Sequence, residues 1–437
     1  MQDLGIISPS LEEFRERAVT HRVIPVCIKI LADSLTPIGI YRSLVLHDGA
    51  ADPGTFLLES AKIATEGESA AWDRYSFIGA SSRSTLTTRD GKIYWQGQTP
   101  AGAPTEGDPV EAIDQTLRML HTEPVPGLPP LTSGLVGYLG WDVVRRWENL
   151  PYPPADDVNL PEFALNMVSD MAIHDNTDGT VLLIANAINF NDTDENVDDA
   201  YVDAVERLHR MLQQLEQGAS ETASVLTGVS EVNARIHREV TQTWSVQGYQ
   251  DAIDRCKKNI IDGDVFQIVI SRRFEVETGA DALDVYRVLR QSNPSPYMYL
   301  FNFEDAEGIP FQIVGSSPEA LVTLKEGRAT SHPIAGSRPR GATREQDIAL
   351  AEELLADQKE CSEHLMLVDL ARNDLSRIAK PGTVSVDEFM VIERFSHIMH
   401  ISSSVSAELD PQFSAYDVLR VAFPAGTLSG APKPRAM

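Results

Sequence analysis

Short apolar runs alternate with polar turns through the first hundred residues, a pattern that is typical of β-strands. Between positions 21 and 100 the runs VIPVCIKIL, GTFLLES, RYSFIGAS, STLTT and KIYWQG follow this pattern. Gly, Asp and Ser residues separate them and favour turns. Two further apolar runs, at 163–174 and 180–188, predict a pair of strands. The first half of the chain therefore predicts a lobe that is rich in β-sheet.

Helical patterns interrupt the strands in both halves of the chain. Asp108 and Pro109 suit the cap and the first position of a helix at 108–121, and a second helix is predicted at 198–217. In the second half we expect helices ending at Gly263 and spanning 343–366, and strands at 265–276, 297–303, 311–315, 319–324, 383–391 and through ERFSHIMHISSSVSAEL. The elements mix without a regular βαβ alternation, which predicts an α+β fold with antiparallel sheets.

A low-hydrophobicity segment divides the chain. Residues 218–245 are rich in Ser, Thr, Glu and Ala and show little apolar pattern, so they are predicted to be a linker. We expect an N-terminal lobe at 1–217 and a second domain at 246–437. A length of 437 residues is ample for two lobes.

The composition excludes several classes of protein. The formal net charge is −27, which disfavours binding to nucleic acid or to an anionic membrane. Cys27, Cys256 and Cys361 are too few and too scattered for a disulfide framework, which fits a reducing cytoplasm. The first residues show no signal-peptide pattern, and no run approaches the roughly 18 apolar residues of a membrane span.

Residues 357–378 predict a helix with an acidic face. Glu360 and Glu363 lie three positions apart, so both carboxylates point from the same side. Their mutual repulsion costs about 0.2–0.5 kcal/mol. A divalent cation between them would turn this cost into binding energy, and carboxylate oxygens suit Mg²⁺. A solvated acidic face is the alternative. Cys361, Leu365 and Val368 form a neighbouring apolar row that is expected to face a core.

Seven segments of the second half resemble, in unbroken order, motifs of the chorismate-utilising enzymes. They are GDVFQIVISRRF, NPSPYMYLF, VGSSPEALV, HPIAGSRPRG, DQKECSEHLMLVDLARNDLSRI, ERFSHIMHISSSV and AGTLSGAPKPRAM. The resemblance covers most of 245–437 and reaches the first lobe through FLLES and RYSFIG. It implies an α+β fold, a two-lobed sandwich of mostly antiparallel sheets flanked by helices, with chorismate and Mg²⁺ bound in a cleft.

The resemblance assigns a role to each matching residue. Glu363 is expected to bind the metal directly, and Glu360 to be a ligand or an outer-shell partner. Glu319 matches the general acid that protonates the departing C4 hydroxyl of chorismate, and burial near carboxylates raises the pKa of such a group. His400 matches the active-site histidine, whereas His397 is expected on the opposite face of its strand. Four residues are expected to offer backbone N–H and hydroxyl donors to the substrate carboxylates: Gly336, Ser337, Gly426 and Thr427.

Each of these residues also has a purely structural interpretation. A Glu at a strand edge is usually solvated, a lone His beside a strand is usually structural, and Gly-Ser pairs usually form turns. Ser337 stands where the family usually has Thr; the change keeps the hydroxyl and loses a methyl group, so little effect is expected.

Two positions separate the branches of the family. Members that add water carry a lysine base where this chain has Gln267, and aminodeoxychorismate synthases carry a lysine where it has Ala335. Ammonia needs no such base, and Ala335 leaves no amine for a covalent intermediate. The pair therefore resembles the anthranilate-forming members, which convert chorismate and ammonia into anthranilate and pyruvate. No cysteine lies in a nucleophile elbow, so ammonia is expected from a separate glutamine amidotransferase subunit in a hetero-oligomer.

Three alternatives stay open at this point. An isochorismate or salicylate synthase is disfavoured by Gln267. An aminodeoxyisochorismate synthase keeps the same residues but releases no pyruvate. A third possibility is a tryptophan-binding regulatory protein that has lost catalysis.

A tryptophan site is implied by two segments. GTFLLES resembles the element that binds tryptophan as a feedback inhibitor, so Glu59 and Ser60 are expected to meet the ammonium and polar groups of that ligand. Pro296, Tyr297 and Met298 are expected to form an apolar wall for the indole. The alternative is a loop that leads into a core strand.

The resemblance stops at SGAPKPRAM, whereas members of the family continue for roughly 70–80 residues. That part carries a second metal-binding Glu, and a Tyr and an Arg that contact the substrate. We therefore expect the natural protein to be longer, and the 437-residue polypeptide to be poorly soluble or inactive.

Overall fold

The computed structural model describes residues 4–61, 74–121, 124–218, 240–395 and 397–437, which form two compact units that are interleaved along the chain. The first unit comprises Met1–Val143, Asp156–Thr222 and Ala282–Pro318; the second comprises Val144–Ala155, Ala223–Asp281 and Glu319–Met437. A single boundary at 218–245 does not describe this division, because 282–318 return to the first unit. Most of the predicted linker, 219–239, lies outside the described residues.

The first unit is built on one ten-stranded antiparallel sheet. Its path is β1-β2-β10-β9-β6-β5-β14-β15, with β7 beside β6 and β8 beside β9. The strands are β1 (Ile7–Ser8), β2 (Val23–Leu31), β5 (Phe56–Glu59), β6 (Tyr75–Arg89), β7 (Lys92–Gly97), β8 (Leu135–Leu139), β9 (Phe163–Asp175), β10 (Thr180–Ile188), β14 (Tyr297–Glu304) and β15 (Pro310–Ser317). A small pair, β3 (Leu46–His47) and β4 (Ala50–Ala51), stands apart from it.

Most of the strands that the short apolar runs predicted are present, and the differences have local causes. RYSFIGAS and STLTT belong to one strand, β6, because register shifts between Gly79 and Thr85 let the Ser-rich middle continue pairing with β9. The helix predicted at 108–121 is α4 (Pro109–Met119), and the Asp108 carboxylate caps it by accepting from the amide of Val110 at 2.8 Å.

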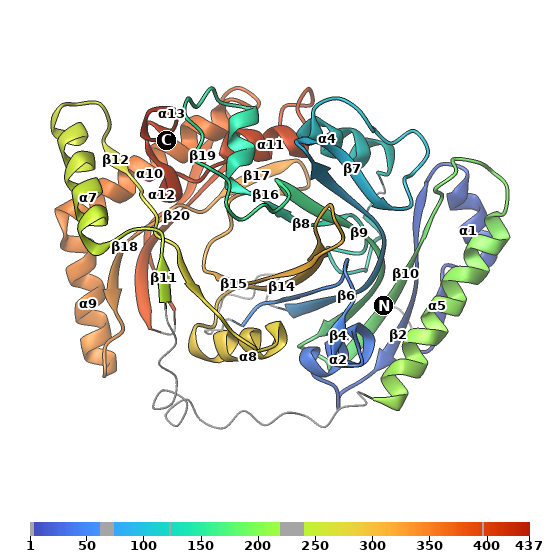
Figure 1. Ribbon diagram of the computed structural model, residues 1–437. Helices are drawn as coiled ribbons and strands as arrows, with labels where there is room; N and C mark the ends of the chain where they lie inside the picture. The colour runs from blue at the N-terminus through green and yellow to red at the C-terminus, as the bar shows by residue number, and fades with distance from the viewer. Residues whose placement is uncertain (1–3, 62–73, 122–123, 219–239, 396) are drawn as a thin grey trace. The chain divides into compact units, whose positions relative to one another are not determined.

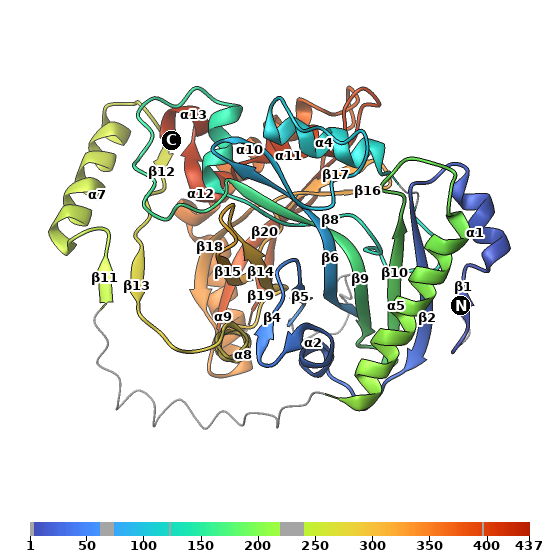
Figure 2. The same ribbon diagram turned by 45° about the vertical axis from the view of Figure 1, so that its right-hand side comes forward.

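Helices cover one face of this sheet. They are α1 (Leu11–Ala18), α2 (Pro37–Val45), α5 (Val197–Gln217) and α8 (Ala282–Ser292), and Figure 2 shows α5 running alongside β2 and β10. Ile78 belongs to the core beneath these helices, while its neighbour Phe77 belongs to a second core on the opposite face. This separation is the period-two alternation of a strand buried on both sides.

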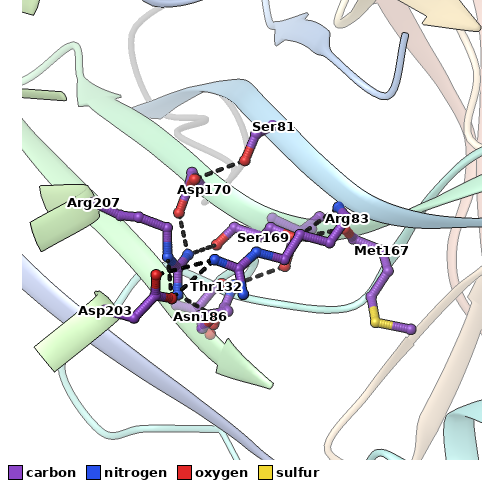
Figure 3. Close-up of polar contacts among 10 residues, drawn as sticks. Ser81, Arg83, Thr132, Met167, Ser169, Asp170, Asn186, Asp203 and Arg207 are labelled. Carbon is purple, nitrogen blue, oxygen red and sulfur yellow. Dashed lines mark hydrogen bonds and ion pairs between the residues drawn. The ribbon is translucent and has the colours of Figure 1, made fainter. Parts of the chain in front are cut away.

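A buried ion network fastens α5 to the sheet (Figure 3). Arg207 is only 4% exposed. Its guanidinium donates to the Asp170 carboxylate, to Asp203 Oδ2 at 3.0 Å and to the carbonyl of Asn186 at 2.9 Å. Asp170 also accepts from Ser81, which lies in the irregular part of β6. Asp203 belongs to α5 itself, whereas Asp170 and Asn186 belong to β9 and β10, so the network fixes the helix on the sheet.

The second unit contains a five-stranded antiparallel sheet with β20 at its centre. Its strands are β16 (Thr323–Lys325), β17 (Arg328–Ser331), β18 (Ile334–Pro339), β19 (Ser385–Arg394) and β20 (Ile398–Glu408). Two short pairs accompany it: β11 (Val240–Gln242) with β13 (Phe274–Val276), and β12 (Gln267–Ile268) with β21 (Gly430–Ala431). The helices are α7 (Val246–Ile261), α9 (Arg344–Ala356), α10 (Gln358–Ser376), α11 (Ala415–Ala422), α12 (Gly426–Ser429) and α13 (Lys433–Ala436). A 3-10 helix, η1 (Trp141–Arg146), spans a division between the units.

Helices α9 and α10 lie against β18 and β20 (Figure 1). The predicted helices at 343–366 and 357–378 are these two helices, separated at Asp357, whose extended backbone ends α9 and whose carboxylate caps α10. Val368 packs in the core as predicted, but Leu365 is 47% exposed. The buried row of α10 instead continues from Val368 through Ala371 to Leu375.

The predicted fold class, α+β with mostly antiparallel sheets and flanking helices, is confirmed. The predicted strand at 265–276 is reduced to β12 and β13, because each of these pairs with a different short partner. Among the described residues, no helix combines the length and the apolar composition that a membrane span requires.

Candidate active site

Helix α10 presents the two predicted metal ligands. Glu360 and Glu363 lie one turn apart, and both are half-buried. Gln267 Nε2 donates a hydrogen bond to Glu363 Oε1 at 3.0 Å. Lys359 Nζ lies 3.4 Å from Glu360 Oε1, but its side chain is 81% exposed, so solvent screens this pair. Gln267, predicted to mark the amine-using branch, therefore holds a carboxylate of the acidic pair.

Gly336 brings β18 close to Glu360. The strand is irregular between Ala335 and Ser337, and Gly336 has φ +72° there, a conformation that glycine adopts without strain. A Cβ atom at this position would lie 3.2 Å from Glu360 Cβ. Glycine at this bulge therefore avoids both the backbone strain of a positive φ and a tight contact with Glu360.

His400 occupies the middle of a row that crosses three strands. Ser337 of β18 and Glu393 of β19 are its register partners, so the three side chains share one face of the sheet. His400 Nδ1 lies 3.1 Å from the Gly336 carbonyl. A carbonyl only accepts, so the proton is on Nδ1 and Nε2 is the acceptor of the neutral ring. His397 is exposed and precedes β20.

Glu319 lies just before β16 and is half-buried. Burial, followed by the negative charge of Glu393, raises the pKa of Glu319 to about 7. A raised pKa is the direction expected of a general acid. The negative charge that contributes to it belongs to Glu393 of the protein, and not to the substrate. Glu393 thus raises the pKa of Glu319 and is also the register partner of His400.

One small cavity joins several of the predicted residues. Glu319, Gly426 and Thr427 line a space of about 40 Å³, together with apolar side chains of α10. The other predicted residues are not among its lining residues: Gln267, Gly336, Ser337, Glu360, Glu363 and His400. They connect to one another through the contacts described above. The structure thus places Glu319 with the first two residues of α12, here named the Gly426–Thr427 turn, and the α10 carboxylates with β18 and Gln267.

The α10 pair is suitable for Mg²⁺ but does not form a complete cage. Across the part of the chain that the structure describes, no group of three or more His, Cys, Asp or Glu side chains is placed to hold a metal ion. Mg²⁺ commonly binds through one or two carboxylates and keeps water or substrate oxygens as its other ligands. The two hard-oxygen donors of Glu360 and Glu363 fit that mode.

The predicted tryptophan residues come together in the first unit. Met298 of β14 is the register partner of Glu59 in β5, and the amide of Ala61 donates to the Ser295 carbonyl at 3.0 Å, which brings Ser60 and Pro296 close to them. Tyr297 is 37% exposed, whereas Met298 is 1% exposed and belongs to the core. Among the five predicted residues, Tyr297 is the most exposed and carries the aromatic ring.

Two residues that the sequence reasoning missed hold the Glu59 carboxylate. Tyr286 Oη donates to Glu59 Oε2 at 2.6 Å, and Arg290 Nε lies 3.2 Å from the same oxygen. Burial, with the adjacent Glu59 charge, raises the pKa of Tyr286 well above its ordinary value. Both belong to α8, which was not predicted; apolar residues at helical spacing in ALDVYRVLRQS were the available signal.

The fold is that of a family of chorismate-binding enzymes. The family profile described as chorismate binding enzyme matches residues 60–437, and the chain belongs to this family.

Curated relatives narrow the assignment to anthranilate synthase component 1. The protein of that name from Arthrobacter globiformis is 59% identical over 437 residues, covering 100% of this chain and 80% of the relative. Its counterpart from Mycolicibacterium smegmatis is 52% identical over 429 residues, covering 98% of this chain and 79% of the relative. This similarity identifies the chain as an enzyme of that group.

Solved structures agree. Anthranilate synthase component I from Streptococcus pneumoniae TIGR4 superposes with a TM-score of 0.68 at 29% identity, covering 86% of this chain and 77% of that one. The menaquinone-specific isochorismate synthase MenF from Escherichia coli has a TM-score of 0.64 at 15% identity, covering 98% and 82% respectively, which shows the fold alone.

Proposed function

We propose that this protein converts chorismate and ammonia into anthranilate and pyruvate. The observation that carries the proposal is its similarity over the full chain, at up to 59% identity, to proteins named anthranilate synthase component 1. Gln267 and Ala335 support it, because they replace the lysines of related enzymes that form other products.

The residues around Gly336 and Gly426 bind the substrate in this proposal. Chorismate carries two carboxylates, which need hydrogen-bond donors in a partly buried site. The backbone N–H groups and hydroxyls of Ser337 and Thr427 are suitable donors, and the neighbouring glycines allow close approach. Glu360 and Glu363 would hold Mg²⁺, and the ion would supply positive charge to a substrate carboxylate.

Glu319 supplies the proton in this proposal. Ammonia adds at C2 of the ring and loses one proton, while the C4 hydroxyl leaves as water with the proton of Glu319. The C2 proton is then lost, the methylene carbon of the enolpyruvyl group gains a proton, and the C3–O bond breaks, so that pyruvate leaves and the ring becomes aromatic. A carboxyl with a pKa of about 7 is protonated in a large fraction of molecules at neutral pH, which suits a general acid. His400, with its Nδ1 proton held by Gly336, offers Nε2 as an acceptor beside the departing group.

We further propose that ammonia comes from a glutamine amidotransferase subunit in a hetero-oligomer. The relatives' name, component 1, supports a multi-component enzyme. The three cysteines are free thiols, which supports a reducing cytoplasmic location.

Feedback inhibition by tryptophan is the regulatory part of the proposal. Glu59 supplies a buried carboxylate and Ser60 lies next to it; Tyr297 and Met298 begin the neighbouring strand β14, and Pro296 immediately precedes it. Ser60→Phe is expected to abolish inhibition by tryptophan while anthranilate formation continues. Inhibition that persists unchanged in a chorismate assay contradicts this site.

The test is an assay of the protein with chorismate, ammonium and Mg²⁺. Fluorescent anthranilate and pyruvate are expected in equal amounts, and chelation of the metal is expected to stop both. Aminated product without pyruvate identifies an aminodeoxyisochorismate synthase, and a hydroxylated product identifies an isochorismate-type enzyme. Tryptophan binding in a calorimeter with no product identifies a regulatory protein.

A further inference from the structure

The second unit contains a buried ion pair that the proposed chemistry does not use. Lys433 Nζ donates to Asp374 Oδ2 at 2.6 Å and to the carbonyl of Ala422 at 2.9 Å. The side chains of Lys433 and Asp374 are 10% and 11% exposed. Removing two charges from water is costly, and an apolar pair of similar size often stabilises a fold as well or better. The location of the pair suggests a role other than stability.

Both charged residues face the cavity that holds the predicted general acid. Asp374 and Lys433 line the same space of about 40 Å³ as Glu319, Gly426 and Thr427. Asp374 lies on α10, two turns beyond Leu367, and Lys433 begins α13. Their ion pair therefore joins α10 to the chain segment that forms the other wall of the cavity.

That segment, residues 422–433, is named here the 422–433 hook. Lys433 holds both of its ends, because it belongs to one end and its ammonium binds the carbonyl of Ala422 at the other. Between them, Gly426 packs so closely on Leu370 of α10 that an added Cβ atom would overlap that side chain. The position of the Gly426–Thr427 turn is thus set by contacts with α10 at two points.

The hook also supports Gln267. Gly430 and Ala431 pair with Gln267 and Ile268 as β21 and β12. Gly430 has φ +115°, and an added Cβ atom there would collide with the carbonyl of Gln267. Because Gln267 donates to Glu363, the hook reaches both the substrate turn and one predicted metal ligand.

We propose that Lys433 and Asp374 are positioning residues for the enzyme: their ion pair closes the 422–433 hook on α10 and so sets the Gly426–Thr427 turn and the Gln267–Glu363 contact in register for chorismate. The inference rests on the proposed function, since it takes Thr427 to bind substrate. Neither residue takes part in a chemical step.

The test compares Lys433→Met, Asp374→Leu and the double variant with the wild-type protein, with ammonium as the nitrogen source. We expect the KM for chorismate to rise about tenfold or more in each variant, with a smaller change in kcat. The reason is that displaced donors of the Gly426–Thr427 turn weaken the binding of chorismate and take no part in the chemical step. The double variant is expected to resemble each single variant rather than their product, because the two charges act as one unit. A KM that stays within twofold of wild type in folded variants overturns the proposal.

Controls separate positioning from loss of stability. Ile378→Ala removes a buried side chain of the same core outside the cavity, and is expected to lower the melting temperature while leaving KM unchanged. Lys380→Met removes an exposed ion pair with Glu408 and is expected to change neither. If the Ile378→Ala variant shows the same rise in KM, the pair is structural only. Should Lys433→Met fail to fold, Asp374→Asn replaces it, because the asparagine keeps the shape and the acceptor oxygen and loses only the charge. A severalfold rise in KM is then required of Asp374→Asn.

Calorimetric titration of chorismate in the presence of Mg²⁺ distinguishes failure of this inference from failure of the proposed function. A wild-type protein that binds chorismate but forms no anthranilate overturns the proposed function, and the dissociation constants of the variants then decide the positioning role. A wild-type protein that neither binds nor converts chorismate overturns both.

Discussion

The carboxyl of Glu319 shows how its neighbours determine what one residue can do. An ordinary Glu, with a pKa near 4.3, is ionised at neutral pH and has no proton to donate. Burial and the Glu393 carboxylate raise the pKa of Glu319 to about 7. The protein therefore carries its own means of keeping a proton on this group, before any substrate charge is added.

A pH profile tests this arrangement. The protonated carboxyl is the active form, so kcat is expected to fall as pH rises through the pKa of Glu319. Glu393→Gln removes the negative charge that raises this pKa, so the fall is expected at lower pH than in the wild type. Glu388→Gln, on the exposed part of the same strand, is the control and is expected to leave the profile unchanged. Glu319→Gln is expected to lower kcat by roughly 10²- to 10⁴-fold; a smaller loss means that another group donates the proton.

A second prediction at this scale concerns the tryptophan site. Tyr286→Phe removes the hydroxyl that donates to Glu59 and leaves a buried carboxylate with one donor fewer. We expect the inhibition constant for tryptophan to rise roughly fivefold, as a loss of about 1 kcal/mol implies, with kcat unchanged. Val285→Ala, at an exposed position of the same helix, is the matched control. Equal inhibition of the two variants contradicts a role for Tyr286.

Helix α10 is the element on which the second unit's candidate residues depend. Its outer side presents Glu360 and Glu363, while its inner side contacts β20 through a buried polar link. His364 Nε2 lies 2.6 Å from Ser403 Oγ, which also accepts from the amide of Met390 at 2.9 Å. Because the link is neutral and fully buried, it keeps the helix in register with the strand that carries His400.

The pH dependence of stability tests this link. Burial lowers the pKa of His364 to about 4, below the value of about 6.5 in an unfolded chain. Stability from the neutral ring is complete above the unfolded value and is lost as pH falls from about 6.5 to about 4. At about 1.4 kcal/mol per pH unit, the loss is at most roughly 3 kcal/mol.

His364→Gln is the comparison, because its amide still reaches a hydrogen-bonding group but does not titrate. Denaturant unfolding at several pH values is expected to show a steeper loss in the wild type than in this variant. Parallel curves between pH 7 and 4.5 contradict the assignment. Carboxylates that lose stability at acid pH contribute equally to both proteins and cancel in the difference.

At the scale of the whole molecule, the two proposed ligands belong to different units. The tryptophan residues all lie in the first unit and the chorismate and metal residues in the second, although 282–318 interrupt the second unit's sequence. Each ligand is therefore expected to protect a different set of backbone amides from hydrogen exchange.

Hydrogen exchange measures this separation. Tryptophan is expected to protect β5, α8 and β14, and chorismate with Mg²⁺ is expected to protect β18, α10 and the 422–433 hook. A ligand at about 100 times its dissociation constant stabilises the state it binds by roughly 2.7 kcal/mol, which is readily detected. Protection of α10 by tryptophan with none at β5 contradicts the proposed inhibitor site.

Local sequence alone determined much of this protein. Short apolar runs predicted β2, β9 and β10, Asp108 predicted the start of α4, and a three-residue spacing placed Glu360 and Glu363 on one side of α10. These features depend on neighbours a few positions away, so a short window of sequence contains their cause. The order of motifs was likewise enough to indicate the family.

Only the tertiary structure decided the features that join distant positions. Glu393 raises the pKa of Glu319, and Lys433 forms an ion pair with Asp374. Tyr286 and Arg290 both contact the Glu59 carboxylate, and residues 282–318 return to the first unit. Each of these features joins residues that are far apart in the sequence. The exposure of Leu365, against the prediction, belongs here too, since helical spacing gives a row of side chains but not the direction of the core. Burial, charge proximity and strand pairing depend on distance in space, which no local pattern specifies.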